Sequence, residues 1–252
     1  MYKKNLRCIK KINSLFNRLN IKKGENIVFH SNIAGLHQFE KKQKKEMYYE
    51  EFLKFLINYI GKNGTLLIPT YNYDFTKGKK FHRRTTKSQV GTFSNIILKK
   101  YYKSRTFDPI FSHLVFGKLK KEIFDCKSDE VFGNNSVFEI MNRKNFKIIS
   151  FCCSPSTITF LHFIEKKLKV NYRYDKFFKG FCERKRVKIK YFVGKKKINY
   201  FIKEKKVLSL VNNRQFKKVS FGRFSTFVVK ANYLFKVLKK KIDKNQNYLI
   251  KN

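Results

Sequence analysis

Residues 26–31 read NIVFHS, residues 46–60 read EMYYEEFLKFLINYI, and residues 65–71 read TLLIPTY. The first and third segments are short apolar runs typical of buried strands, and the second places apolar residues at helical spacing. A strand, a helix and a second strand with a crossover of this length predict a parallel βαβ unit. This unit decides the fold class, because it requires a parallel sheet covered by helices.

The same pattern returns further along the chain. The apolar run 146–153 precedes an expected helix over 157–168, and amphipathic helices are predicted over 4–20 and 229–241. We therefore predict an α/β fold, in which helices flank a central, mostly parallel sheet.

A small β-rich subregion is predicted near the C-terminus. Residues 186–202 alternate in pieces and bend at Gly194, which indicates a β-hairpin. Residues 219–228 contain a further strand. Residues 72–90 are polar and irregular, and a loop this long in a compact domain is usually functional.

The length of 252 residues suits a single α/β domain. No Pro/Gly/Ser-rich linker and no internal repeat divides the sequence. We expect one domain over 1–252, with a core at about 20–185 and the β-rich subregion at about 186–240. Hydrophobic residues make up 42% of the chain, which excludes wholesale disorder, and no apolar run is long enough to span a membrane.

The charge is strongly positive, with 59 Lys and Arg against 17 Asp and Glu and a net charge of +42. One interpretation is binding to nucleic acid or another polyanion. The other is compositional bias, because Phe, Tyr, Ile, Asn and Lys are the residues that AT-rich coding sequences favour. Lys is far commoner than Arg and is spread along the whole chain, whereas specific phosphate and base recognition prefers Arg. We favour compositional bias and expect no specific nucleic-acid partner.

The five cysteines at 8, 126, 152, 153 and 182 form no C-x-x-C pair. An odd number with this spacing suits neither a disulfide framework nor a zinc site. The basic N-terminus is followed by no apolar signal region. We therefore expect a reduced, cytoplasmic protein without a metal.

Three segments are candidates for function. His30 lies where a predicted strand ends, and ligands bind at the carboxyl ends of parallel strands, although spacing alone is equally compatible with a buried histidine. His162 and Glu165 share a helix face, which suits either a general base or a surface ion pair. Ser136 and Glu139 form a capping box, for which a structural role is sufficient. No G-x-G-x-x-G, P-loop or G-x-S-x-G motif is present, which argues against dinucleotide enzymes, P-loop kinases and ordinary α/β-hydrolases.

Seven segments in this order resemble the aminoglycoside 3-N-acetyltransferase family, whose fold differs from that of the common acetyltransferases. They are HSN at 30–32 with Gly35, GTLLIPT at 64–70, RTTKSQVG at 84–91, RTFDPIFSHLVFG at 105–117, FGNNSVF at 132–138, TFLHFIE at 159–165 and YRYDKFFKG at 172–180. The resemblance covers about residues 20–240. Each match alone is weak, but their shared order and spacing make the resemblance specific.

The resemblance implies a single acetyltransferase domain that transfers an acetyl group from acetyl-CoA to an amine on a sugar. It implies His162 as general base, held by Glu165. The residues implied in binding acetyl-CoA are His30, Ser31, Asn32, Gly35, Thr70, Arg84, Thr86, Ser88, Gly91 and Ser112. Among them, the hydroxyl groups of Ser31, Thr70 and Ser112 are also candidates to stabilise the thioester oxygen. A thioester is already activated, so Cys152 and Cys153 are expected to be small buried residues and not nucleophiles.

Three departures from the family pattern bear on the acceptor. Phe111 stands where drug-modifying members usually have a histidine, Asn32 replaces a serine, and Phe151-Cys152-Cys153 replaces a glycine-rich strand end. The segment 172–180 follows relatives encoded with polysaccharide-assembly genes. We therefore expect an amino sugar of a surface polysaccharide or of its nucleotide-linked precursor as acceptor, in preference to an aminoglycoside.

Two other classes remain open: a non-catalytic polyanion-binding protein, and a family member that binds CoA without turnover. The sequence leaves the oligomeric state open, with a homodimer as one alternative.

Overall fold

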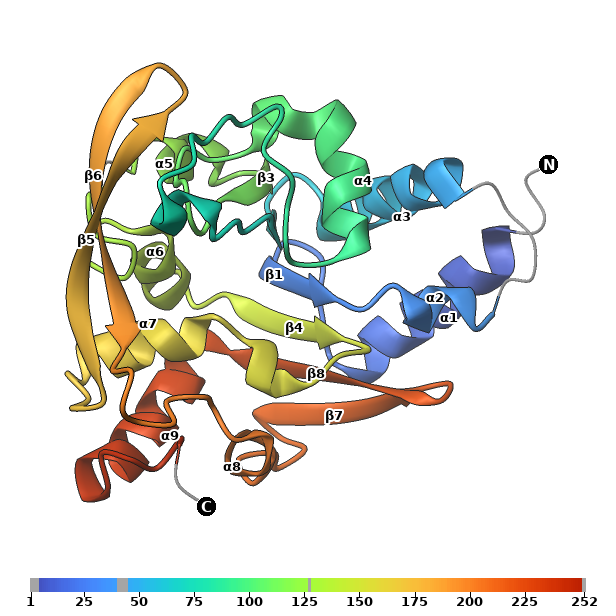
Figure 1. Ribbon diagram of the computed structural model, residues 1–252. Helices are drawn as coiled ribbons and strands as arrows, with labels where there is room; N and C mark the ends of the chain where they lie inside the picture. Colours follow the sequence, from blue (N-terminus) through green and yellow to red (C-terminus); the bar gives the residue numbers. More distant parts are fainter. Residues whose placement is uncertain (1–4, 40–44, 127, 251–252) are drawn as a thin grey trace.

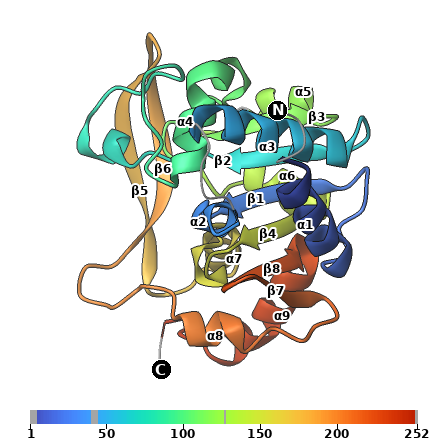
Figure 2. The ribbon, with the colours of Figure 1, turned by 90° about the vertical axis from the view of Figure 1, so that its right-hand side faces the viewer.

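The computed structural model describes residues 5–39, 45–126 and 128–250. Its centre is a six-stranded sheet in the order β3-β2-β1-β4-β8-β7 (Figures 1 and 2). The strands are β1 (Asn26–Ser31), β2 (Thr65–Pro69), β3 (His113–Gly117), β4 (Lys147–Phe151), β7 (Phe216–Phe221) and β8 (Phe224–Lys230).

The sheet has a parallel centre with antiparallel edges. β1 is parallel to its neighbours β2 and β4, whereas β3 runs antiparallel to β2, β8 to β4 and β7 to β8. Four of the six strands therefore point in one direction, which confirms the predicted fold class. The chain leaves β1 toward β2 on one side and returns to β4 on the other, so the ends of these strands border a crevice of the kind that binds ligands.

Helices cover both faces of the sheet because alternate strand residues point to opposite sides. Ile27 and Phe29 belong to one apolar core, and Val28 belongs to the other. The first core is covered by α1 (Asn5–Arg18), α3 (Lys45–Ile60) and α4 (Thr92–Tyr101), and the second by α6 (Val137–Arg143), α7 (Phe160–Lys167) and α9 (Ala231–Lys244). The shorter helices are α2 (Ala34–His37), α5 (Lys120–Phe124) and α8 (Glu204–Leu208), with 3-10 turns at Asp74–Lys77, Tyr102–Ser104 and Pro155–Thr157.

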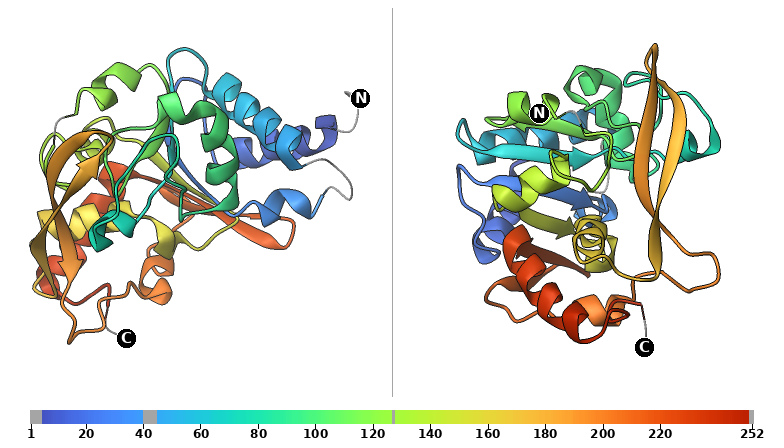
Figure 3. Two further views of the ribbon diagram at one scale, coloured as in Figure 1. Left: turned by 45° about the horizontal axis from the view of Figure 1, so that its top comes forward. Right: turned by 90° about the vertical axis from the view of Figure 1, so that its left-hand side faces the viewer.

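A two-stranded antiparallel ribbon stands at one side of the molecule, beside α7 and the loop 72–90 (Figure 3). It consists of β5 (Arg173–Cys182) and β6 (Lys185–Gly194). The predicted hairpin at 186–202 is therefore wrong in its position, because the turn lies between Cys182 and Lys185. Gly194 ends β6 instead of bending it. The lack of a side chain at residue 194 leaves room for the Tyr200 ring, which occupies the place of a Cβ atom there.

The predicted strand at 219–228 is two strands. β7 and β8 are joined by Gly222 and Arg223, and the φ angle of +60° at Gly222 suits a two-residue hairpin turn. Both strands extend the central sheet, so the ribbon alone forms a separate β structure. The predicted helices agree closely, and within the described residues no helix is long and apolar enough to cross a membrane.

Candidate active site

A cavity of about 440 Å³ opens at the carboxyl ends of β1, β2 and β4. Its lining comprises Phe29, His30, Ser31, Pro69, Tyr71, Tyr73, Val90, Gly91, Ser94, Phe111, Cys153, Ser156, Thr157, Ile158, Thr159, His162 and Tyr191. The strands, the loop before α4, the start of α7 and the ribbon each contribute. This is the edge at which parallel sheets bind ligands.

His162 and Glu165 form a close pair on α7. Nδ1 of His162 lies 2.6 Å from Oε2 of Glu165, while the His162 side chain is 25% exposed and that of Glu165 is fully buried. The two residues are one helical turn apart, as the sequence predicted, and the apolar residues around Glu165 bury this face of α7. Within the described part of the chain, no residue forms a hydrogen bond with Nε2 of His162, which belongs to the cavity wall.

Two further residues hold the buried Glu165 carboxylate. The hydroxyl of Tyr172 donates to Oε1 at 2.7 Å, and Nε of Arg173 lies 2.8 Å from Oε2. The Arg173 contact is an ion pair without the alignment of a hydrogen bond. Burial alone would raise the pKa of Glu165, but the charges and hydrogen bonds of His162, Arg173 and Tyr172 outweigh burial and lower it. Glu165 is therefore ionised at neutral pH.

His30 and His113 have a different environment. His30 lines the cavity at the end of β1, and burial lowers its pKa to about 4. His113 is completely buried behind it, with Nε2 at 3.0 Å from the hydroxyl of Tyr71. Burial, and secondarily the proximity of His30, lowers the pKa of His113 to about 3. Both imidazoles are neutral at neutral pH, and neither forms an ion pair with a described carboxylate.

The two segments expected to border the acetyl-CoA site meet at the cavity. Ser31 and Gly91 both line it, and a Cβ atom at Gly91 would lie 3.6 Å from the Ser31 carbonyl oxygen. Gly91 has a φ angle of +94° and precedes α4 without a side-chain cap. The first N–H groups of a helix lack intrahelical partners and attract anions. This donor set fits a phosphate or a polarised carbonyl oxygen.

Thr70 and Ser112 lie in a buried network outside the cavity lining. Their hydroxyls are 3.1 Å apart, and Nε of Arg105 donates to the Ser112 hydroxyl at 2.9 Å. Arg105 is fully buried and also donates to the carbonyl oxygens of Thr70, Arg83 and Thr86. The network thus joins the end of β2 to the loop that carries Arg84 and Ser88.

The other expected binding residues belong to this loop or to the turn after β1. Arg84 is exposed, with its guanidinium 5.5 Å from the centre of the Tyr102 ring. The Thr86 hydroxyl accepts from the backbone N–H of His82, and that of buried Ser88 accepts from Val90. None of these three side chains lines the cavity.

The turn after β1 contains Asn32 and Gly35, which also lie outside the lining. Asn32 is exposed, and its side-chain oxygen accepts from the backbone N–H of Ala34. Gly35 is buried against Cys152, whose sulfur would lie 2.2 Å from a Cβ atom at residue 35. Their places show local structural roles, and their predicted part in acetyl-CoA binding stays a prediction.

Cys152 and Cys153 directly follow β4. Burial raises the pKa of the Cys152 thiol to about 12 and that of the Cys153 thiol to about 11, so neither is a thiolate at neutral pH. Cys153 lines the cavity, and Cys152 is buried with a φ angle of +55°. Among the described residues, no group of three or more His, Cys, Asp or Glu side chains is arranged to hold a metal ion.

Four residues that shape this site were assigned no role from the sequence, namely Tyr71, Arg105, Tyr172 and Arg173. Tyr172 and Arg173 follow Glu165 by seven and eight residues, but α7 ends at Lys167, and only the turn between α7 and β5 brings them back to Glu165. A usable signal was the Tyr-Arg pair that begins the next strand after this helix. For Arg105 the fold itself was needed, since three of its acceptors are backbone oxygens of Thr70, Arg83 and Thr86.

Comparison with known proteins identifies the fold and the family. No curated protein sequence matches the chain. The solved structure titled aminoglycoside acetyltransferase AAC(3)-IVa, apoenzyme, has a TM-score of 0.74 at 13% identity, covering 98% of this chain and 91% of its own. The YokD protein from Bacillus subtilis has a TM-score of 0.74 at 14% identity, covering 95% and 94%. AAC-IIIb, solved as a binary complex with CoASH, has a TM-score of 0.74 at 12% identity, covering 95% and 96%.

At these low identities the TM-scores of 0.74 show a shared fold, and a family model supplies the link to a family. The family model described as aminoglycoside 3-N-acetyltransferase matches residues 28–243, which is most of the chain. The protein belongs to the aminoglycoside 3-N-acetyltransferase family, a family of acyltransferases.

Proposed function

We propose that this protein, acting as a single domain, transfers an acetyl group from acetyl-CoA to an amine of an amino sugar, with His162 as general base. The observation that carries the proposal is the His162–Glu165 pair on the wall of a cavity at the ends of three parallel strands. The fold shared with a CoASH complex supports the choice of co-substrate. The proposal includes a cytoplasmic location, because acetyl-CoA is an intracellular metabolite.

The contact between His162 and Glu165 supports Nε2 as the nitrogen that takes the proton. An ionised carboxylate only accepts hydrogen bonds, so Nδ1 must carry the hydrogen that it donates to Glu165. The lone pair is then on Nε2, which has no described partner. A sugar ammonium cannot attack a thioester until it loses a proton, and Nε2 accepts that proton. As the imidazole becomes positive, the buried Glu165 carboxylate stabilises it.

The opposite side of the cavity suits the acetyl donor. When bound there, acetyl-CoA supplies the activated carbonyl carbon that the amine attacks. The N-terminus of α4, the Ser31 side chain and the backbone of Gly91 are placed to donate to its oxygens. The exposed Arg84 extends this side toward solvent, where it can meet a phosphate.

The walls of the cavity favour an acceptor other than a polycationic aminoglycoside. The described lining residues include no Asp or Glu, and the chain carries a net charge of +42. Several positive amines would therefore meet no compensating carboxylate inside. Four aromatic side chains, those of Tyr71, Tyr73, Phe111 and Tyr191, offer flat surfaces to a sugar ring. We propose a single-amine sugar, such as a nucleotide-linked amino sugar or a unit of a surface polysaccharide.

The test is an acceptor panel assayed by release of free thiol from acetyl-CoA. The panel contains simple amino sugars, nucleotide-linked amino sugars and aminoglycosides, each at equal concentration. We expect turnover to require an amine and to be fastest with a nucleotide-linked amino sugar. Fast acetylation of aminoglycosides with no activity on nucleotide-linked amino sugars would reverse this choice of acceptor.

Salt dependence tests the alternative of a polyanion-binding protein. Binding to a polyanion falls steeply between about 50 and 200 mM salt, whereas acetyl transfer at saturating acetyl-CoA and amine should change little. Tight, salt-sensitive nucleic-acid binding together with no thiol release for any amine would favour the alternative.

A further inference from the structure

We infer that Arg173, assisted by Tyr172, is a positioning residue that keeps His162 in the form that accepts a proton. The inference rests on the proposed role of His162 as base. Tyr172 and Arg173, the first two residues of the segment 172–180, would act on catalysis by holding Glu165 and would not contact the substrate.

The contacts converge on one carboxylate. Oε2 of Glu165 lies 2.6 Å from Nδ1 of His162 and 2.8 Å from Nε of Arg173, while Oε1 accepts from the Tyr172 hydroxyl at 2.7 Å. The side chains of Glu165 and Arg173 are 0% and 5% exposed. Arg173 is held in turn by donation from Nη2 to the carbonyl oxygen of Tyr200. Both oxygens of Glu165 thus have partners: Oε1 contacts Tyr172, the residue before β5, and Oε2 contacts His162 of α7 and Arg173 of β5.

Charge balance explains why this matters for His162. A buried carboxylate without a cation is strongly unfavourable, so some positive charge must neutralise Glu165. Arg173 supplies that charge permanently. If Arg173 were absent, the nearest group able to supply it would be His162, by taking a second proton. A doubly protonated imidazole has no lone pair on Nε2 and cannot act as a base.

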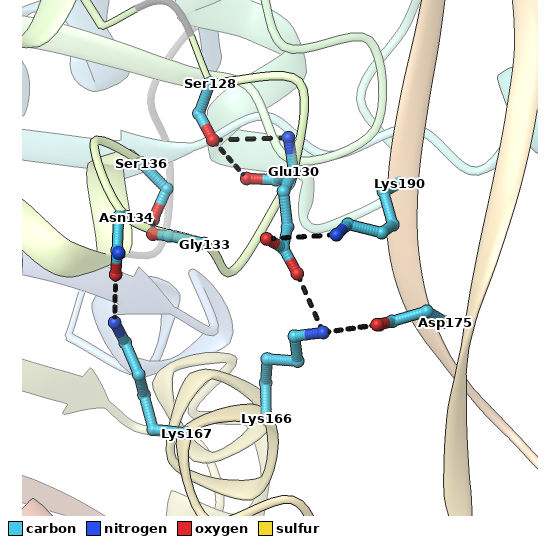
Figure 4. Close-up of polar contacts among 9 residues, drawn as sticks. All are labelled: Ser128, Glu130, Gly133, Asn134, Ser136, Lys166, Lys167, Asp175 and Lys190. Atoms are coloured by element: carbon cyan, nitrogen blue, oxygen red, sulfur yellow. Dashed lines mark hydrogen bonds and ion pairs between the residues drawn. The ribbon is translucent and has the colours of Figure 1, made fainter.

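The two lysines that follow Glu165 on α7 do not replace Arg173, and Lys167 is paired with Glu139 at 2.7 Å. Lys166, the next residue of α7, is engaged by Glu130 at 2.7 Å and by Asp175 at 2.6 Å (Figure 4). Tyr191 of β6 is an uncharged phenol, and burial, the largest cause, raises its pKa well above the usual value. Arg173 is therefore the cation that compensates Glu165 while His162 remains neutral.

The Lys166–Asp175 pair provides a matched control. It joins the same helix to the same strand, but it does not touch Glu165, and its side chains are 19% and 39% exposed. Asp175→Asn weakens the docking of the ribbon on α7 without altering the charge next to His162. Arg173→Gln removes the charge on Glu165, and Arg173→Lys restores a cation with fewer donors.

The experiment measures the pH dependence of kcat/KM and, independently of turnover, the NMR titration of the His162 imidazole, assigned by the signal missing in His162→Ala. For Arg173→Gln we expect the acidic limb and the NMR midpoint to move upward by about one pH unit, with kcat about 10- to 100-fold lower. Arg173→Lys should recover most of the shift, and Asp175→Asn should leave the midpoint in place.

Two results would overturn the inference: a folded Arg173→Gln variant with an unmoved midpoint, or an equal shift in Asp175→Asn. If Arg173→Gln does not fold, Tyr172→Phe replaces it as the test. In that variant we expect a smaller upward shift of the NMR midpoint, and an unchanged midpoint would count against the inference. Full turnover in His162→Ala would instead refute His162 as the proposed base. The NMR midpoints would still measure the effect of Arg173 on the imidazole.

Discussion

The two walls of the cavity handle charge in opposite ways. The helix wall consists of His162 backed by Glu165, Tyr172 and Arg173, and it buries an ionised carboxylate with its partners. The strand-end wall, formed by His30, Ser31, Tyr71, Gly91 and Cys153, contains only neutral groups at neutral pH. His113 lies behind the strand-end wall.

This difference shows that burial alone does not prepare a histidine to accept a proton. His30 is buried at the cavity, and burial lowers its pKa to about 4 because no carboxylate among the described residues compensates the charge of its protonated form. His162 has an anionic neighbour that stabilises the protonated form as it appears. We therefore expect changes in the helix wall to alter the rate, and changes in the strand-end wall to alter binding or stability.

The strongest test of this division is His162→Ala. General-base assistance is commonly worth about 10²–10⁴ in rate, so kcat should fall by that order while the Kd for acetyl-CoA stays within a few-fold. His162→Asn should behave alike, since an amide is no base, and both variants should lose the acidic limb of kcat/KM. Thiol-release kinetics and calorimetry measure the two quantities. Near-full turnover with an unchanged pH profile would move the search to His30 and His113.

His113→Gln tests the strand-end wall through stability. Folded His113 has a pKa of about 3, below the usual histidine value of about 6.5, so the unfolded chain binds a proton that the folded chain does not. The wild-type free energy of unfolding should therefore decrease as pH falls from about 6.5 to about 3, by up to about 1.4 kcal/mol per pH unit for this group. Glutamine keeps a partner for Tyr71 but cannot titrate, so the variant's curve should be flatter.

Urea unfolding at a series of pH values measures the two stability curves. Parallel curves for wild type and His113→Gln would show that His113 titrates alike in both states. The kcat/KM profile should keep its acidic limb in this variant, in contrast to His162→Ala.

Arg84→Ala should affect binding alone. Arg84 is exposed on the loop that leads to Gly91, and Gly91 meets Ser31 at the cavity. A guanidinium there can contact the 3′-phosphate of CoA. A charge-assisted hydrogen bond at an exposed site is worth about 1.4 kcal/mol, or tenfold in Kd. We expect the affinity for CoA to fall by that factor and the affinity for dephospho-CoA to change little, as measured by calorimetry. Equal losses of affinity for both ligands would show that Arg84 does not contact the 3′-phosphate.

The smallest effect is expected from Cys152→Ala combined with Cys153→Ala. Both thiols are protonated at neutral pH, and neither is needed as a nucleophile when the acyl group arrives as a thioester. Most turnover should remain, with a loss of about 1–2 kcal/mol in the free energy of unfolding from the smaller buried side chains. An acyl group trapped on either cysteine, detected by mass spectrometry, would contradict the division between the walls.

Local patterns were sufficient for most of the fold. The apolar run 26–31 and the helix 46–60 predicted the βαβ unit because their periodicities differ clearly. The ribbon was misplaced because Arg173–Cys182 mixes aromatic and lysine residues on a strand exposed over most of its length, so that no buried face marked it as a strand. The turn at Glu183 and Arg184 lacks glycine, which removed the usual hairpin signal.

The candidate site was predictable where it depends on helical spacing. His162 and Glu165 were paired from their separation alone, and the structure places them in contact. The contacts of Glu165 with Tyr172 and Arg173 join a helix to a strand, and no short-range pattern predicts such a pairing. The same holds for Arg105, whose acceptors come from β2 and the loop 72–90.

The close approach of Gly35 and Cys152 has an evolutionary consequence. A side chain at residue 35 would begin 2.2 Å from the Cys152 sulfur and 2.7 Å from its Cβ, whereas a glycine at 152 would leave the Phe151 ring as nearest neighbour at 3.4 Å. The φ angle of +55° at residue 152 already favours glycine. The two positions therefore form an epistatic pair with a permitted order of substitution: 152 must become glycine before 35 can gain a side chain. Homologous sequences should show alanine or larger residues at 35 only together with glycine at 152.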